Sequence, residues 1–294
     1  MKRLVLVAPL LLAAAVVELA SGCSKPKPVV LVEDAAPLNV TPIATASVAR
    51  KVNPDNLPAY SGPTGSVEGK ITVTGDPAPE SGIKSFPLCK DASAEAVYGH
   101  TFREGTATSP GGPRPLADAI VAITGYGNFF VPEKNEAHPV TIEGCSFGAR
   151  TVTMTFGQRL EVSNKSSAFW TPLLQPAVAN LQMMAVPGGD PIKLVPRREG
   201  FYRLLDRDRT WAESDVYVLY HPLHTVSTLA GTYRIDGIPA GKVKVNTSHP
   251  RIPSSEAAQE IEIKPDEVAH ADLALVYHTP AKPDAGASPP PILK

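Results

Sequence analysis

The sequence predicts an all-β fold, and three observations lead to this prediction. The chain of 294 residues holds 31 prolines, and a proline inside a helix costs about 3 kcal/mol. Apolar and polar residues alternate over several short segments that glycine, proline and asparagine separate, which is the pattern of half-buried strands. No segment carries an amphipathic helical stripe. Short strands joined by such turns are typical of a β-sandwich or barrel.

The composition bears on size and on partners. The length predicts about two domains, and a hydrophobic content of 43% is enough for a packed core. Lysine and arginine number 28 against 29 acidic residues, which is a formal net charge of −1. Nucleic-acid binding rests on clustered positive charge, so we expect no nucleic-acid partner.

The chain begins with a segment typical of a secretory signal peptide. Lys2 and Arg3 precede an apolar run from Leu4 to Val17, and small residues stand before Cys23. This arrangement matches the basic, apolar and small-residue regions of such signals. The apolar run is shorter than the roughly 20 residues that a membrane-spanning helix needs. An ordinary signal peptide followed by a chance cysteine is one interpretation.

The other interpretation comes from the residues around the cysteine. The sequence L-A-S-G-C ending at Cys23 resembles the lipobox of bacterial lipoproteins, with Ala20 where that family usually has leucine. The resemblance implies that residues 1–22 are removed as a signal peptide and that Cys23 is acylated, which anchors the chain to a membrane. Ser24 after the cysteine implies the outer membrane, facing the periplasm or the cell surface.

Two proline-rich segments flank the predicted body. Residues 23–63 are rich in proline, alanine, valine and threonine and show no lasting strand or helix period. We expect a semi-rigid, disordered tether there, since proline-rich chain is extended. Residues 278–294 have a similar composition and predict a disordered tail.

Ten segments between tether and tail predict strands. Residues 66–74 alternate strictly between apolar and polar positions, whereas residues 119–124 are apolar throughout, as in a strand buried on both faces. The stretch 172–187 predicts at most a helical turn or two. The ten segments are Ser66–Thr74, Ala119–Thr124, Val140–Ile142, Thr151–Phe156, Arg159–Val162, Asp215–Tyr220, Thr232–Ile235, Lys242–Asn246, Glu260–Ile263 and Ala269–Val276.

The chain has three cysteines, and if Cys23 belongs to a lipobox, Cys89 and Cys145 are the two that remain. An even pair in an oxidising compartment predicts a disulfide. The alternative is two free thiols, one of which could ligate a metal. Neither cysteine has a second cysteine or a histidine at the spacing of a metal motif, which favours the disulfide.

A strand–turn–strand pattern lies between Gly231 and Val245, where the chain reads G-T-Y-R-I-D-G-I-P-A-G-K-V-K-V. The pattern resembles the carboxypeptidase regulatory-like domain, a prealbumin-type β-sandwich and a non-catalytic accessory module. It predicts a hairpin that turns at residues 237–241 and points Tyr233 and Val243 toward the core.

A second resemblance covers the middle of the chain. The segments ending at Thr124, Phe147, Ser166 and His224 carry L-A-D-A-I-V-A-I-T, E-G-C-S-F, F-G-Q-R-L-E-V-S-N-K-S and V-L-Y-H-P-L-H, and they resemble a cupredoxin-like domain. Residues 64–75 resemble the first strand of the regulatory-like module. The two resemblances together imply interleaved sandwiches, with 64–75 plus 230–277 forming the regulatory-like sandwich and 76–229 inserted as the cupredoxin-like domain.

The cupredoxin resemblance implies a set of copper-ligand positions, which this chain largely lacks. Trp170 stands where the first histidine belongs and Val218 where the cysteine belongs, whereas His221 matches a histidine and His224 replaces the methionine. A type 1 copper centre needs a cysteine thiolate and two histidines, so none is expected. His221 and His224 could still bind Cu(II) or Zn(II) weakly. The alternative is that both are polar loop residues and that Trp170 fills the core.

No sequence motif of a hydrolase, metallopeptidase or nucleotide-binding enzyme is present, so we expect no enzyme. The run Arg197–Arg209 alternates in charge and predicts a solvated ribbon or a partner-facing edge. We therefore expect a cell-envelope lipoprotein that acts as a binding or structural module, without a cofactor and with an envelope protein as a possible partner. The alternative is a periplasmic copper-binding or electron-transfer protein that uses His221 and His224. Carbohydrate or polymer binding is a third hypothesis.

Overall fold

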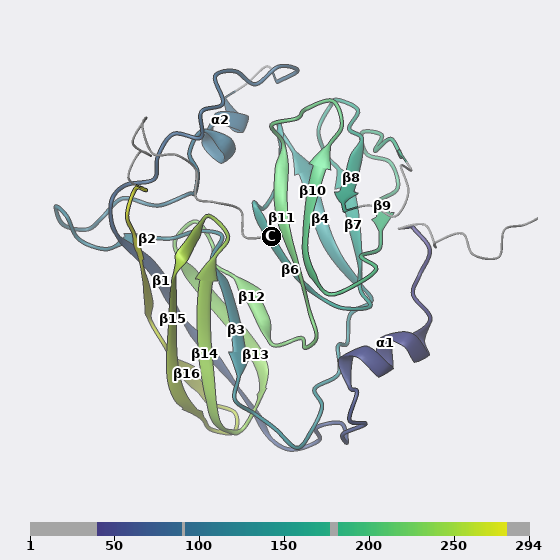
Figure 1. Cartoon of the computed structure of the whole chain (residues 1–294), viewed down its shortest axis with the longest axis vertical. Helices are drawn as coiled ribbons and strands as arrows, with labels where there is room; N and C mark the ends of the chain where they lie inside the picture. The colour runs from purple at the N-terminus through teal and green to yellow at the C-terminus, as the bar shows by residue number, and fades with distance from the viewer. Residues whose placement is uncertain (1–39, 90–91, 177–181, 281–294) are drawn as a thin grey trace, which may run out of the picture. The chain divides into compact units, whose positions relative to one another are not determined.

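The computed structural model describes residues 40–89, 92–176 and 182–280. It confirms the predicted all-β fold, and within these ranges only two short helices, α1 (Thr45–Val52) and α2 (Ser93–Tyr98), accompany the strands (Figure 1). The predicted signal peptide 1–22, the predicted acylation site Cys23 and nearly all of the predicted tail lie outside the described residues. Neither of the two helices is long and apolar enough to cross a membrane.

One group of strands surrounds a hydrophobic core that includes Val67, Val121 and Val245, and we call this group sandwich A. Its strands in the described chain are β1 (Thr64–Gly75), β2 (Arg114–Pro115), β3 (Ile120–Thr124), β12 (His224–Val226), β13 (Thr232–Pro239), β14 (Gly241–His249), β15 (Ile252–Ile263), β16 (Val268–His270) and β17 (Leu273–Tyr277). One sheet has the order β13-β1-β16, with β17 and β2 also paired to β1, and the facing sheet has the order β12-β3-β14-β15.

The other strands surround a second core, which includes Met154, Leu160 and Leu204, and form sandwich B. They are β4 (Ala137–Glu143), β5 (Ser146–Phe147), β6 (Thr151–Thr155), β7 (Arg159–Asn164), β8 (Pro172–Gln175), β9 (Ile192–Leu194), β10 (Gly200–Asp206) and β11 (Glu213–Leu219). Their sheets have the orders β6-β11-β10-β8 and β5-β4-β7-β9.

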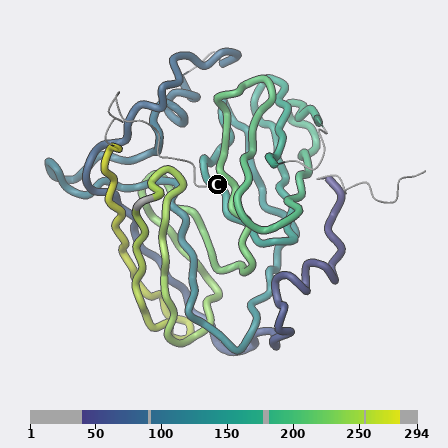
Figure 2. The backbone as a smooth tube through the Cα atoms, in the orientation of Figure 1, coloured from purple at the N-terminus to yellow at the C-terminus, as the bar shows by residue number. Residues whose placement is uncertain are grey.

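Strand β1 joins an early and a late part of the chain in one sheet. It pairs antiparallel with β13 and parallel with β16 and then β17, so early and late segments of the backbone lie side by side (Figure 2). Gly69 makes this close approach possible, because a Cβ at that position would collide with the carbonyl oxygen of Ala271.

The predicted hairpin between Gly231 and Val245 is wrong, because its two strands lie in different sheets. β13 pairs with β1, whereas β14 pairs with β3 and β15. Tyr233 and Val243 do point inward as predicted, since both are buried in the core of sandwich A. They reach that core from opposite sheets, and the chain crosses between the sheets near Ala240.

The boundary predicted at residues 76–229 also needs correction. β3 hydrogen-bonds to β14 and β12, and β2 hydrogen-bonds to β1. These three strands were assigned to the inserted domain and belong to sandwich A instead. The continuous apolar run of β3 is consistent with either sandwich, because an apolar pattern specifies burial and not the partner strand.

The tether prediction for residues 23–63 is wrong at its described end, where α1 lies. Val48 and Val52 of this helix pack against the core of sandwich B. The contact is close, because a Cβ on Gly157 would lie 2.6 Å from Cγ1 of Val48. Gly157 also has a φ of 104°, which glycine adopts without strain.

The charged run Arg197–Arg209 is not a solvated ribbon along its whole length. It contains β10, in which Tyr202, Leu204 and Asp206 are buried. Arg209 is also buried, and its guanidinium carbon lies 4.3 Å from the ring centroid of Trp170. The start of the stretch 172–187, where a helical turn was predicted, is strand β8, and residues 177–181 lie outside the described chain.

Candidate functional site

His224 is held between two threonines of the neighbouring sandwich. It opens β12 in sandwich A, and its Nδ1 lies 2.9 Å from Oγ1 of Thr153 while its Nε2 lies 3.3 Å from Oγ1 of Thr155. The two threonines are buried and lie on one face of β6, because residues two apart on a strand share a face. One imidazole therefore spans both hydroxyl groups.

The hydrogen bonds assign the tautomer of His224. The Thr155 hydroxyl donates to a carboxylate oxygen of Glu133 at 2.7 Å, so its only proton is used there and its oxygen accepts from His224. Nε2 of His224 thus carries the proton, and Nδ1 accepts from Thr153. Burial, with smaller contributions from His221 and His138, lowers the pKa of His224 to about 3.

His221 lies beside His224 but differs from it in its contacts. The two ring centroids are 6.2 Å apart, and the ring of Tyr126 meets His221 edge-on at the same distance. Nδ1 of His221 is buried, and no group of the described residues forms a hydrogen bond with it. Burial also lowers the pKa of His221, so the imidazole is held neutral.

A cavity of about 640 Å³ borders this cluster, and we call it the histidine cavity. Its lining includes His138, His224, Glu133, Thr153 and Gln158. Burial lowers the pKa of His138, against the opposing influence of Glu133. The cavity wall thus presents neutral imidazoles and hydroxyl groups, together with the side chains of Glu133, Asp236 and Lys134. The carboxylate of Glu133 already accepts a hydrogen bond.

The residues at the expected copper-ligand positions do not fit a type 1 centre. Trp170 and Val218 are buried in the core of sandwich B, so the alternative in which Trp170 fills the core is confirmed. The lone pair of His224 faces a threonine hydroxyl, and both body cysteines are consumed in a disulfide. Within the described residues, no group of three histidine, cysteine or acidic side chains is placed to hold a metal ion.

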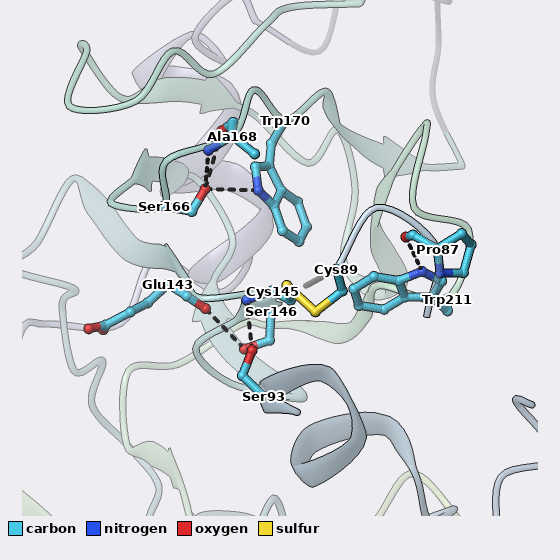
Figure 3. Close-up of a disulfide and its surroundings, with 10 residues drawn as sticks. All are labelled: Pro87, Cys89, Ser93, Glu143, Cys145, Ser146, Ser166, Ala168, Trp170 and Trp211. Atoms are coloured by element: carbon cyan, nitrogen blue, oxygen red, sulfur yellow. Dashed lines mark hydrogen bonds between the residues drawn. A yellow bond between two sulfur atoms is a disulfide. The ribbon is translucent and has the colours of Figure 1, made fainter. Parts of the chain in front are cut away.

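The predicted disulfide between Cys89 and Cys145 is confirmed, with the Cα atoms 5.7 Å apart (Figure 3). The backbone N–H of Cys145 donates to Oγ of Ser93 at 3.0 Å. The indole N–H of Trp211 donates to the carbonyl oxygen of Pro87 at 3.2 Å. The bridge therefore holds the segment before Cys89 against sandwich B.

A cluster of arginines and carboxylates, which the sequence analysis missed, lies where residues of the two sandwiches meet. Arg251, directly before β15, pairs with Glu213 and Asp215 of β11 at 2.6 and 2.9 Å. Arg103 forms a two-pronged bond to Asp118 at 2.7 and 2.6 Å. No short-range pattern could have revealed these pairs, because the partners are far apart in the sequence.

His249 belongs to the same cluster and contributes no charge. Its Nδ1 accepts from the backbone N–H of Arg251 at 3.0 Å, and burial lowers its pKa to about 4. Burial also raises the pKa of Asp215, against the opposing effect of Arg251. These shifts reflect a dry environment around the ion pairs.

The comparisons with known proteins name no family for this chain. No protein-family profile matches the sequence, and no curated protein matches it. Solved structures that are similar to part of the chain include amicyanin from Paracoccus versutus, at 17% identity over 30% of this chain and 85% of that one, with a TM-score of 0.26. A purple cupredoxin from Nitrosopumilus maritimus is 14% identical over 28% of this chain and 98% of that one, with a TM-score of 0.24. Likenesses at this level assign no function.

Proposed function

We propose that the chain is a non-enzymatic module of the cell envelope that binds or supports other envelope components and carries no type 1 copper centre. The observation that supports this proposal best is the position of His224 between Thr153 and Thr155. The side chain that could replace a copper ligand is engaged in a contact between the two sandwiches, so its role there is structural.

The same geometry argues against a hydrolase. A hydroxyl that donates to a histidine nitrogen, as Thr153 does at 2.9 Å, is the arrangement of a nucleophile and its general base. A general base works best when its pKa lies near the operating pH, and the pKa of His224 is lowered to about 3. Thr153 does line the histidine cavity, but a base with so low a pKa activates its hydroxyl poorly.

The proposal includes attachment to the outer membrane through an acylated Cys23, on the strength of the lipobox pattern. Mass spectrometry of the amino-terminal peptide from the membrane fraction tests it directly. A Cys23→Ser variant is expected to leave the membrane fraction, and a variant that stays there would contradict the anchor.

Calorimetric titration with Cu(II) and Zn(II) tests the absence of a metal function. We expect no saturable heat from either metal beyond that of a His270→Ala control, which removes an exposed histidine. Binding at micromolar affinity that is lost in the His221→Ala/His224→Ala double variant would overturn the proposal.

Metal binding by His221 and His224 is the second candidate function, and one observation favours it. Nδ1 of His221 is buried and has no hydrogen-bond partner in the part of the chain that the structure describes, and an unpaired buried acceptor is costly. A bound cation would satisfy it. The His221→Ala variant separates the candidates, because it removes this nitrogen and leaves the bonds of His224 to Thr153 and Thr155 in place.

A further inference from the structure

A second cavity, of about 340 Å³, lies beside the arginine cluster, and we call it the arginine cavity. Three aromatic side chains form part of its wall, namely Tyr98, Trp211 and Tyr277, and each is at least nine-tenths buried. Arg150, Arg251 and Glu213 line it as well. A cavity of this size falls at the lower end of the range of roughly 300–1,000 Å³ that holds small ligands.

Arg150 is a buried cation without a carboxylate partner. The residue is 8% exposed, and no carboxylate oxygen in the described chain lies within the 4.0 Å that defines an ion pair. Its Nη1 donates to the carbonyl oxygen of His100 at 2.7 Å, and its guanidinium carbon lies 5.7 Å from the ring centroid of Tyr98. Burial lowers the pKa of Arg150. A buried charge is costly unless an opposite charge meets it.

The acidic residues near Arg150 are already paired. Asp118 binds Arg103 through both oxygens. Glu213 binds Arg251 at 2.6 Å and Arg203 at 3.0 Å. Asp215 binds Arg251 as well.

The ion pairs of this cluster leave Arg150 out. Its buried and half-buried arginines are Arg103, Arg150 and Arg251, and its acids are Asp118, Glu213 and Asp215. Arg203 also contacts Glu213, but its side chain is 44% exposed and solvent screens its charge. His249 adds no charge, because its pKa lies at about 4. Each of the three acids is held by an arginine other than Arg150.

We propose that the arginine cavity binds a small organic carboxylate, with the carboxylate on Arg150 and an apolar body against Trp211 and Tyr277. A guanidinium fork matches the two oxygens of a carboxylate, and among the described residues only Nη1 of Arg150 donates to a protein acceptor. One unpaired guanidinium matches a monoanion better than phosphate, which carries about two negative charges at neutral pH. Aromatic walls favour an apolar body over a purely polar one.

This inference does not depend on the proposed function, since an occupied arginine cavity is compatible with either a binding module or a metal protein.

The test uses the full chain and three carboxylates as probes, namely acetate, benzoate and octanoate. Benzamide serves as the uncharged match of benzoate, and inorganic phosphate as the other anion. Binding is measured by calorimetry and by the fluorescence of Trp211, which lines the cavity.

We expect saturable binding of benzoate or octanoate, tighter than that of acetate, phosphate or benzamide. An Arg150→Met variant keeps the length of the side chain and removes its charge, so affinity is expected to fall about tenfold or more, the cost of a lost charge-assisted hydrogen bond. Arg150→Lys is expected to retain part of the binding. The control is Arg114→Met, because Arg114 is paired with Glu104 at 2.8 Å and does not line the cavity.

Three results would each overturn the inference. They are no saturable binding of any carboxylate to the folded wild-type chain, equal binding of benzoate and benzamide, or phosphate binding more tightly than every carboxylate. If Arg150→Met fails to fold, the comparison of benzoate with benzamide on the wild-type chain still tests whether binding requires the carboxylate. A folded Arg150→Met variant that binds benzoate like the wild type would show that the carboxylate does not meet Arg150.

Discussion

The histidine cavity and the arginine cavity both lie where residues of the two sandwiches meet, but their polar groups are satisfied in different ways. At the histidine cavity, Thr153, His224, Thr155 and Glu133 form one chain of hydrogen bonds in which each proton has an acceptor. At the arginine cavity, Arg150 is a buried cation that no carboxylate of the described residues pairs with. The hydrogen bonds of the first arrangement are complete within the protein, whereas the second leaves a guanidinium that a ligand carboxylate can bind.

The contrast also shows that a motif and a binding site need not coincide. The sequence indicates a candidate metal site at His221 and His224, because two histidines three residues apart can share a metal ion. No local sequence pattern marks Arg150, because the residues around it come from other parts of the chain.

The disulfide supports the arginine cavity and not the histidine cavity. Trp211 packs edge-on against Phe86 and Tyr98, with ring centroids 5.2 and 5.5 Å away, and the bridge holds the segment that ends at Cys89 (Figure 3). The bridged residues are 56 apart, and a cross-link over such a loop is worth about 4 kcal/mol.

The Cys89→Ala/Cys145→Ala variant is therefore expected to lose about 4 kcal/mol of unfolding free energy and to change the fluorescence of Trp211. Chemical denaturation measures the first and emission spectra the second. The Cys23→Ser variant keeps both bridge cysteines and is the control. A loss below about 1 kcal/mol would show that sandwich B does not depend on the bridge.

Substitution of Asp118 by asparagine tests the balanced part of the arginine cluster. It leaves Arg103 buried without its partner, and breaking such a pair costs about 3 kcal/mol. The side chains of Arg103 and Asp118 are 14% and 4% exposed, so solvent screens the pair little. Denaturant unfolding measures the loss.

Asp266→Asn is the matched control for this substitution. Asp118 and Asp266 have φ angles of 63° and 58°, and asparagine tolerates such angles as well as aspartate does. Asp266 is exposed and forms no ion pair within the described residues. Equal losses in the two variants would point to backbone conformation and not to charge.

Substitution of His224 by glutamine tests the histidine cavity. The two hydrogen bonds to Thr153 and Thr155 are lost or weakened, and each is worth about 1 kcal/mol, so a loss of about 2 kcal/mol is expected. His270→Gln is the control, because that histidine is exposed. An unchanged stability of His224→Gln would remove the structural role assigned to His224.

The lowered pKa of His224 also makes the stability of the fold depend on pH. The pKa of His224 is lowered from 6.5 to about 3 in the fold, so the unfolded chain binds the proton first as the pH falls. The contribution of the neutral ring is complete above pH 6.5 and is lost between pH 6.5 and 3, with a slope of up to about 1.4 kcal/mol per pH unit.

The measurement is the unfolding free energy of the wild type and of His224→Gln between pH 7 and 4. The difference between the two proteins isolates the slope due to His224, because Asp215, whose raised pKa contributes in the opposite direction, is present in both. The wild type is expected to lose stability faster on acidification. Parallel curves for the two proteins would mean that His224 titrates normally in the fold.

The pattern of alternation predicted burial well and strand pairing poorly. Residues 66–74 were predicted as a half-buried strand, and Val67, Ile71 and Val73 of β1 are buried. The same reasoning placed Tyr233 and Val243 inward but put them in one hairpin, whereas β13 and β14 lie in facing sheets. An inward side chain looks the same in the sequence whichever sheet supplies it.

The sequence by itself determined the all-β class, the inward faces of the main strands and the pairing of Cys89 with Cys145, because these depend on local alternation, proline content and an even number of thiols. Only the tertiary structure decided that β3 joins sandwich A, that His224 spans Thr153 and Thr155, and that Arg150 lies buried without a carboxylate. Each of these depends on contacts between segments far apart in the chain. Such contacts are selected by the packing of whole sheets, which no short stretch of sequence specifies.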